Sequence, residues 1–285
     1  MLLSMITILA LAFAWGVWKG SGQWLEALLA FAGGWIGFLI LAAVALLIAC
    51  AVVNKNKEPE KDSKFYRVLT RMWIGFVVTV GRVKVICKGA EKLPKDGRFL
   101  LVCNHQSDID PALLLHCFPE GQLAFISKQE NRDMPIVGSV MHKLLCQQIN
   151  RENDREALKT ILKCIQIVKE DKASIAVFPE GYVSLDCKVR HFRGGVFKIA
   201  QKANVPVVVC TLRDAKKAMD RLLKLKSSRV EVHLVEVIDA EEVKSMSTVD
   251  LGERVYESMI ADLGEEYRTD EKGMHPDLQK KRMEQ

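Results

Sequence analysis

Charge is almost missing from the first 53 residues of this 285-residue chain, where Lys19 and Glu26 are the only charged side chains. From residue 54 onward, charged residues appear at the density of a globular domain. The absence of charge excludes a water-exposed domain at the amino end and divides the chain into two zones. With 49% hydrophobic and 27% charged residues overall, the chain can still bury one sizeable core.

Metal-binding patterns are missing as well. No His or Cys stands at the spacing of a zinc site, and none of the eight cysteines forms a Cys-x-x-Cys pair. A structural metal is therefore not expected. Cys103 and Cys210 lie inside apolar stretches, and we interpret such cysteines as small buried residues of a reducing compartment rather than as disulfide partners.

The apolar zone breaks at residues 19–23 into two runs, 1–18 and 27–53. A membrane-spanning helix needs about 20 apolar residues, so the second run is long enough and the first is borderline. A signal peptide would begin with basic residues, and the opening Met-Leu-Leu-Ser has none. Residues 1–53 are therefore predicted to hold one or two transmembrane helices, as a hairpin or as one span after a signal-like or interfacial segment.

Basic residues crowd the exit of the second apolar run. They are Lys55, Lys57, Lys61, Lys64, Arg67 and Arg71. By the positive-inside bias, they place the rest of the chain on the cytoplasmic side of the cell membrane. The formal net charge of +6 is modest, and its distribution suits membrane phospholipid better than nucleic acid.

Residues 54–82 combine a polar linker with a predicted helix that begins at Arg67. Trp73 and Phe76 stand close to basic residues in this helix, a pattern typical of an interfacial helix that lies on the bilayer. An ordinary core-facing helix fits the same residues, so both interpretations stay open.

Short apolar runs then alternate with helical patterns. Strands are predicted at 83–88, 99–103, 123–127, 174–178, 205–212 and 230–238, and helices at 111–117, 155–170, 194–203 and 240–263. This alternation predicts an α/β domain at 83–268, with a mixed, partly parallel sheet flanked by helices, and a polar tail at 269–285. Ligands of such sheets bind beyond the carboxyl ends of the strands.

One of these strand ends carries Asn104, His105 and Asp110. A neutral imidazole can act as a general base near neutral pH, and a carboxylate that accepts from Nδ1–H would fix its tautomer. Residues five apart do not share a helical face, so the pair requires a turn between strand and helix. Asp110 directly before Pro111 is also a good helix N-cap, which is the structural alternative.

A second strand end reads Phe178-Pro179-Glu180-Gly181. Glu180 offers a carboxylate that can hold an acceptor hydroxyl, and Gly181 allows a backbone to approach a ligand closely. Taken alone, these four residues also make an ordinary turn.

Together, Asn-His-x-x-x-x-Asp at 104–110 and Phe-Pro-Glu-Gly at 178–181 resemble the glycerolipid acyltransferase family. The blocks 127–151 and 205–208 are similar to further motifs of that family, so the resemblance covers about half of the chain. It implies direct acyl transfer, in which His105 deprotonates a hydroxyl and Asp110 orients His105.

The resemblance also implies the substrates. The donor would be acyl-CoA or acyl-carrier protein, and the acceptor a lysophospholipid, foremost the sn-2 hydroxyl of 1-acylglycerol 3-phosphate, giving phosphatidic acid. No metal or other cofactor is implied. The substrate-binding residues would be Asn104, Lys128, Arg151, Glu180, Gly181 and Arg193.

The chain departs from the family pattern after Gly181. The family continues with Thr-Arg-Ser, whereas this chain reads Tyr182-Val183-Ser184, so the arginine that helps to hold the acceptor phosphate is absent. Basic residues follow at 188, 190 and 193, and any of them could replace it. Alternatives are another lysophospholipid or glycerol 3-phosphate as acceptor, a hydrolase, or a noncatalytic lipid-binding protein.

The segment 214–229 carries six basic residues and two acidic ones. Such a run is most often a solvated face. It could also rest on anionic lipid or receive an acidic acyl-carrier protein.

Overall fold

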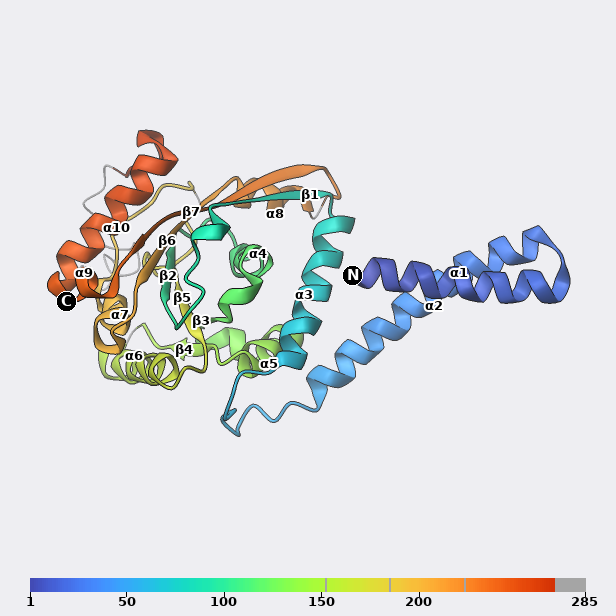
Figure 1. The fold of residues 1–285 in the computed structure, drawn as a ribbon, viewed down its shortest axis with the longest axis horizontal. Helices are drawn as coiled ribbons and strands as arrows, with labels where there is room; N and C mark the ends of the chain where they lie inside the picture. The colour runs from blue at the N-terminus through green and yellow to red at the C-terminus, as the bar shows by residue number, and fades with distance from the viewer. Residues whose placement is uncertain (152, 185, 223, 270–285) are drawn as a thin grey trace, which may run out of the picture.

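Seven strands form one mixed sheet in the order β1-β7-β6-β2-β5-β3-β4 (Figure 1). The structure is a computed structural model that describes residues 1–151, 153–184, 186–222 and 224–269. The strands are β1 (Val83–Lys88), β2 (Leu100–Cys103), β3 (Leu123–Lys128), β4 (Gln147–Ile149), β5 (Ser174–Val177), β6 (Val207–Arg213) and β7 (Ser228–Ile238). All neighbouring pairs are parallel except β6 with β7, so the expected mixed, partly parallel sheet is confirmed.

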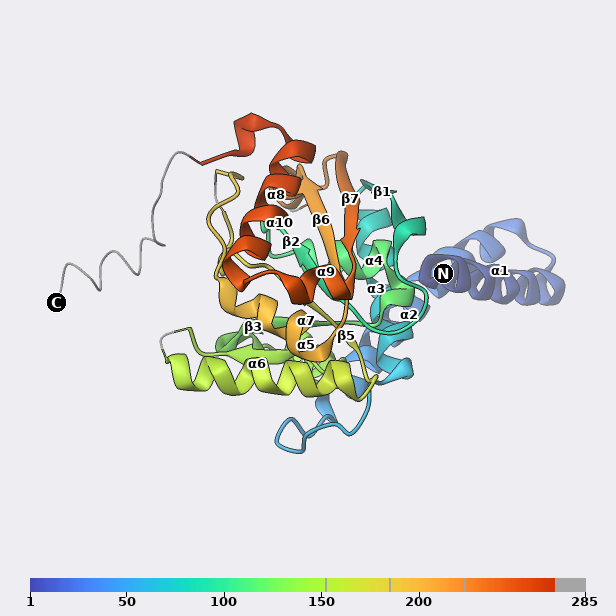
Figure 2. The same cartoon turned by 60° about the vertical axis from the view of Figure 1, so that its left-hand side comes forward.

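Helices cover both faces of this sheet, because each predominantly buried strand presents apolar side chains to both sides. One face packs against α3 (Lys64–Val80), α4 (Asp110–Cys117), α5 (Pro135–Lys143) and α8 (Ala215–Leu222). The opposite face packs against α6 (Asp154–Lys169), α7 (Lys198–Ala203), α9 (Ala240–Ser245) and α10 (Thr248–Leu263). Figure 1 shows α6, α7, α9 and α10 on one side of the strands and α3, α4 and α5 on the other, and in Figure 2 the layer of α6, α7, α9 and α10 is turned toward the viewer.

Several elements differ from the sequence prediction. β4, α5 and α8 were not predicted, since β4 has only three residues and the two helices are short. The helix expected at 240–263 is two helices, because the chain is extended at Met246 and Ser247, and the Ser247 side chain accepts from the Asp250 N–H to start α10. The polar tail predicted at 269–285 lies outside the described residues, apart from Thr269.

The apolar amino-terminal zone folds as two antiparallel helices, α1 (Leu2–Ser21) and α2 (Trp24–Ala51). Both are long and apolar enough to cross a membrane, which makes them candidate membrane anchors. The buried residues of α1 recur every four positions and face α2; they are Leu2, Ile6, Ala10 and Ala14. Gly22, at φ 66°, ends α1 in the left-handed conformation that this tight turn requires. The pair therefore forms the hairpin that was one of the two expected arrangements.

The hairpin projects from the side of the domain that α3 covers (Figure 1). Its carboxyl end is fixed by two hydrogen bonds: the Tyr66 hydroxyl donates to the Ala49 carbonyl (2.6 Å), and the Ser139 hydroxyl donates to the Cys50 carbonyl (2.9 Å). The outer surface of α3 exposes apolar side chains such as Phe65 and Val68. α3 thus lies between the hairpin and the sheet.

The cysteines contain one departure from expectation. Cys87 on β1 and Cys117 at the end of α4 form a disulfide, with Cα atoms 5.5 Å apart. The expectation that these cysteines are free thiols is therefore wrong for this pair, because pairing depends on the approach of two elements that the sequence does not reveal. Cys103 and Cys210 are free and fully buried, as expected.

Candidate active site

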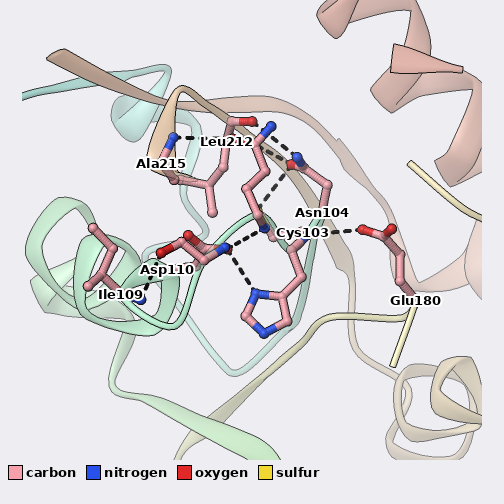
Figure 3. A network of polar contacts seen from close by, with 10 residues as sticks. Cys103, Asn104, Ile109, Asp110, Glu180, Leu212 and Ala215 are labelled. Carbon is pink, nitrogen blue, oxygen red and sulfur yellow. Dashed lines mark hydrogen bonds and ion pairs between the residues drawn. The ribbon is translucent and has the colours of Figure 1, made fainter. Parts of the chain in front are cut away.

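The loop between β2 and α4 brings His105 and Asp110 together (Figure 3). Asp110 Oδ2 accepts from the backbone N–H groups of Gln106 (2.7 Å) and Ser107 (2.9 Å), which closes the turn. The same oxygen lies 2.8 Å from His105 Nδ1. Asp110 therefore organises the loop that precedes α4, whereas α4 has no side-chain cap, so the N-cap alternative does not describe this residue.

The protonation of this pair follows from its surroundings. Because Asp110 Oδ2 already accepts two backbone N–H groups, it acts as an acceptor toward His105 as well, so Nδ1 carries the hydrogen and Nε2 keeps its lone pair. Asp110 is fully buried. Burial raises the pKa of Asp110, and the hydrogen bonds from His105 and the two N–H groups oppose this rise.

The second motif holds His105 from the other side. The imidazole stacks on Phe178 with ring centroids 4.1 Å apart. The backbone N–H of His105 donates to Glu180 Oε1 (2.9 Å), and the backbone carbonyl of His105 accepts from the Ser184 N–H (2.8 Å). Both the ring and the backbone of His105 are thus fixed by the residues that follow β5. Ser184 was not singled out from the sequence, since its contribution is a backbone N–H that any residue possesses.

Glu180 lies away from solvent, contrary to the expected role of holding an acceptor hydroxyl. Its side chain is 2% exposed, and its two oxygens accept from the backbone N–H groups of His105 and Arg190 (3.0 Å). Burial raises the pKa of Glu180 to about 8. Figure 3 shows Glu180 and Asp110 on opposite sides of the loop that carries His105. The geometry therefore makes Glu180 a tie between two loops.

The Asn104 side chain is buried as well. Its amide donates to the Leu212 carbonyl (3.0 Å) and accepts from the Leu212 N–H (2.7 Å), so both of its polar atoms are used by β6. Gln106 extends this tie, because its Oε1 accepts from the Ala215 N–H at the start of α8 (3.2 Å). The expected substrate contact of Asn104 is thus replaced by anchorage of the loop.

The basic residues gather near the same strand ends. Lys128 ends β3, and Arg151 follows β4. Burial lowers the pKa of the Arg151 guanidinium, and the nearby charge of Arg193 lowers it further. Among the residues that the structure describes, the side chains of these three cations make no hydrogen bond or salt bridge with a carboxylate. Arg151 and Arg193 lie close enough for their charges to interact, and the carboxylate of Glu130 opposes them at Arg151, which leaves a net positive charge that suits an anion.

Arg193 crosses over Gly181. Gly181 has φ 83°, and a Cβ built there would lie 3.2 Å from Arg193 Nε, so a larger residue would displace the guanidinium. Arg190 is occupied differently: it donates to Asp186 (2.8 Å) and to the Ser184 hydroxyl (2.9 Å). Of the cations that follow the second motif, Arg193 is thus the one that lies beside Arg151.

An apolar cavity of about 430 Å³ begins at His105. His105, Lys128 and Arg151 line it together with a few other polar residues such as Asp108 and Asn131, and most of its wall is built from apolar residues of α3, α4 and α5. Leu46 of α2 and Leu222 of α8 also line it. The cavity therefore joins the basic strand ends to the side of the domain that carries the hairpin.

Comparisons with known proteins agree with this geometry. The family profile described as Acyltransferase matches residues 84–213. A probable 1-acyl-sn-glycerol-3-phosphate acyltransferase of Mycoplasma pneumoniae is 30% identical over 66% of this chain and 72% of that protein. The chain belongs to the glycerolipid acyltransferase family. It is therefore an O-acyltransferase, which removes the noncatalytic and hydrolase alternatives.

Two further relatives extend the comparison. A 1-acyl-sn-glycerol-3-phosphate acyltransferase of Chlamydomonas reinhardtii is 34% identical over 66% of this chain, but the match spans only 55% of that protein. The crystal structure of the 1-acyl-sn-glycerophosphate acyltransferase PlsC from Thermotoga maritima has the same fold, with a TM-score of 0.56 and 21% identity over 91% of this chain and 95% of that one.

Proposed function

We propose that this acyltransferase transfers a fatty acyl group to the sn-2 hydroxyl of 1-acylglycerol 3-phosphate and so makes phosphatidic acid. The observation that carries the proposal is the His105–Asp110 pair, 2.8 Å apart, at the junction of an apolar cavity and a group of basic residues. An acyl chain suits the cavity, and a phosphate suits the basic residues.

The reaction proceeds in two proton movements. His105 Nε2 removes the proton of the acceptor hydroxyl while the oxygen attacks the carbonyl carbon of a thioester, and Asp110 stabilises the imidazolium that forms. The tetrahedral intermediate collapses with cleavage of the carbon–sulfur bond, and the imidazolium returns the proton to the leaving thiolate. The acyl group thus exchanges sulfur for oxygen without a covalent acyl-enzyme. Acyl-CoA and acyl-carrier protein both supply such a thioester.

The acceptor phosphate is assigned to Lys128, Arg151 and Arg193. Guanidinium groups form paired hydrogen bonds with phosphate oxygens, and the proximity of Arg151 to Arg193 is the arrangement that such an anion would stabilise. Gly181 contributes by giving Arg193 its path across the loop. In this assignment, Arg193 replaces the arginine that the family has at the position of Val183.

Another acceptor is the second candidate, and one observation favours it. Val183 and Tyr182 line the apolar cavity, where the family has a basic residue. A more apolar rim would suit a different lysophospholipid headgroup, while glycerol 3-phosphate would need only the basic residues.

A substrate panel distinguishes these proposals. The purified, detergent-solubilised protein is given labelled acyl-CoA or acyl-carrier protein with lysophosphatidic acid, glycerol 3-phosphate or a zwitterionic lysolipid, beside a His105→Ala control. Conversion of lysophosphatidic acid that disappears in the control supports the proposal. Conversion of another acceptor alone contradicts the assigned substrate and leaves the mechanism standing.

A further inference from the structure

The turn after α8 presents an apolar side chain between basic ones. Leu225 is 62% exposed, and Lys224 and Lys226 beside it are exposed as well. The N–H groups of Lys224 and Lys226 both donate to the Arg221 carbonyl (3.0 Å), and the Leu225 N–H donates to the Leu222 carbonyl (3.1 Å).

Neighbouring segments enlarge this surface. β1 and β7 pair in parallel, with Lys84 beside Arg229, and the Ser228 N–H donates to the Arg82 carbonyl (3.1 Å). Val80, in the last turn of α3, shortly precedes Arg82 and Lys84 in the chain, and its side chain is 44% exposed. We call residues 80–84, 221–222 and 224–229 the basic turn patch. It combines exposed apolar side chains with Arg and Lys.

The basic turn patch lies on the side of the domain that carries the hairpin. A Cβ at Gly81, at the end of α3, would lie 2.0 Å from Leu222 Cδ1, so α8 closes against this end of α3. α2 meets the opposite end of α3 through Tyr66 and Ala49. Figure 1 shows β1 and α8 at one end of α3 and the carboxyl end of α2 at the other. The patch and the hairpin exit thus flank the same helix.

We propose that the basic turn patch is a second membrane contact, in which Leu225 enters the interface and the surrounding Arg and Lys bind anionic phospholipid headgroups. Interfacial elements combine these two residue types, and basic residues near an anionic surface add attraction. An acidic carrier protein would use the charges, but it gives no account of an exposed leucine on the side of the candidate membrane anchors.

This contact would also set the direction in which the site opens. α8 contributes Leu222 to the cavity wall, and its first N–H is held by Gln106 of the loop that carries His105. With Leu225 in the bilayer, α8 holds one wall of the cavity against the lipid surface from which acyl chains enter.

Depth-dependent quenching tests the contact in the full-length protein. A fluorophore is attached at Leu225→Cys in a Cys187→Ser background, and the protein is reconstituted into vesicles with or without phosphatidylglycerol. Val249→Cys is the matched control, because Val249 is 74% exposed on α10, a helix of the opposite face of the sheet. We expect lipid-borne quencher to act on position 225 and aqueous iodide to act on position 249.

The charges are tested with the same label. Neutralising Lys224 or Lys226 to Gln is expected to weaken the contact about fivefold per residue in anionic vesicles. Iodide quenching that is equal at 225 and 249, without quenching from the lipid, would overturn the proposal. The proposal would also fail if the Gln variants kept their lipid quenching while their KM rose for acyl-carrier protein but not for acyl-CoA. That result would identify the patch as a docking site for the carrier protein. The quenching itself needs no turnover, so the membrane contact succeeds or fails separately from the proposed reaction.

Discussion

At His105, one carboxylate oxygen determines which ring nitrogen is basic. Asp110→Ala removes the oxygen that accepts from Nδ1–H and the charge that stabilises the imidazolium, so we expect kcat to fall by about 10⁴-fold. His105→Ala should abolish transfer. Initial rates of labelled acyl transfer measure both effects, with circular dichroism to show that each variant is folded. Activity near the wild-type rate in either variant would remove that residue from the mechanism.

Glu180 gives the fold a pH dependence. Burial raises the pKa of Glu180 from 4.5 to about 8. Between pH 4.5 and 8 this carboxyl is ionised in the unfolded chain but protonated in the folded chain. Its contribution to the free energy of unfolding is therefore complete below pH 4.5 and is lost as pH rises through 8. Glu180→Gln stays neutral and should therefore lose less thermal stability than the parent between these values. Thermal unfolding in detergent at stepped pH measures this, and parallel curves for the two proteins would contradict it.

Arg193 is assigned to bind the phosphate of the acceptor substrate. Arg193→Ala removes a charge-assisted hydrogen bond, so the KM for the phosphorylated acceptor should rise about tenfold or more while the donor KM stays unchanged. Lys188→Ala, in the same loop, is the control and should leave both values unchanged. Equal increases in the two KM values for Arg193→Ala would exclude a specific phosphate contact.

At this scale the sequence predicted contacts within one loop and missed those between loops. The contact between His105 and Asp110 could be predicted because a short turn of consecutive residues joins them. Glu180 and Asn104 could not be interpreted in this way, because their partners are backbone groups 75 and 108 residues away. A motif reveals which side chains cluster, but it does not show which of them face the substrate.

Among the elements, the predicted strands at 83–88, 99–103, 123–127, 174–178, 205–212 and 230–238 each correspond to a strand of the sheet. Their order could not be predicted, since it depends on crossovers rather than on apolar runs. β7 runs antiparallel to β6 and parallel to β1, and this arrangement brings Cys87 on β1 to Cys117 on α4. Strand order thus also determined the one cysteine pairing of the described chain.

The Cys87–Cys117 bond closes a loop with a sequence separation of 30. A loop of this length is expected to stabilise the fold by about 3–4 kcal/mol. Cys87→Ser and a reducing agent should therefore lower the melting temperature by the same amount, and the two effects should not add. Alkylation and mass spectrometry of protein purified in air check the pairing directly, and free thiols at both positions would contradict it. If the domain faces the cytoplasm, the bond should be open in cells, where thiols are kept reduced.

For the molecule as a whole, the helical hairpin of α1 and α2 is structurally joined to the candidate active site. Leu46 of α2 lines the same cavity as His105, so the hairpin forms part of the wall of the site as well as serving as a candidate anchor. α3 joins the two, because its inner face lines the cavity and its outer face exposes apolar residues. An enzyme whose acceptor and acyl chain both reside in lipid gains from such an arrangement, since its substrates need not cross water.

The tip of the hairpin indicates how far it reaches. α1 has 20 residues. At 1.5 Å per residue that is about 30 Å, the thickness of a bilayer core. Trp15, Trp18 and Trp24 are exposed around the tip, and Lys19 Nζ lies 4.5 Å from the Trp15 ring, a combination typical of a membrane–water interface.

We therefore expect the tip to emerge on the face opposite to the catalytic domain. In a background with Cys87→Ser and Cys187→Ser, Ser21→Cys should react with an impermeant maleimide added to intact cells, because the tip would be outside. Val249→Cys, in the catalytic domain, should react only after the cells are opened, because the positive-inside bias of the basic residues after α2 predicts a cytoplasmic domain. Protection of Ser21→Cys until detergent is added would mean that the hairpin ends inside the bilayer. Labelling of Val249→Cys from outside would instead reverse the orientation, and it would place the Cys87–Cys117 disulfide in the oxidising compartment where such bonds persist.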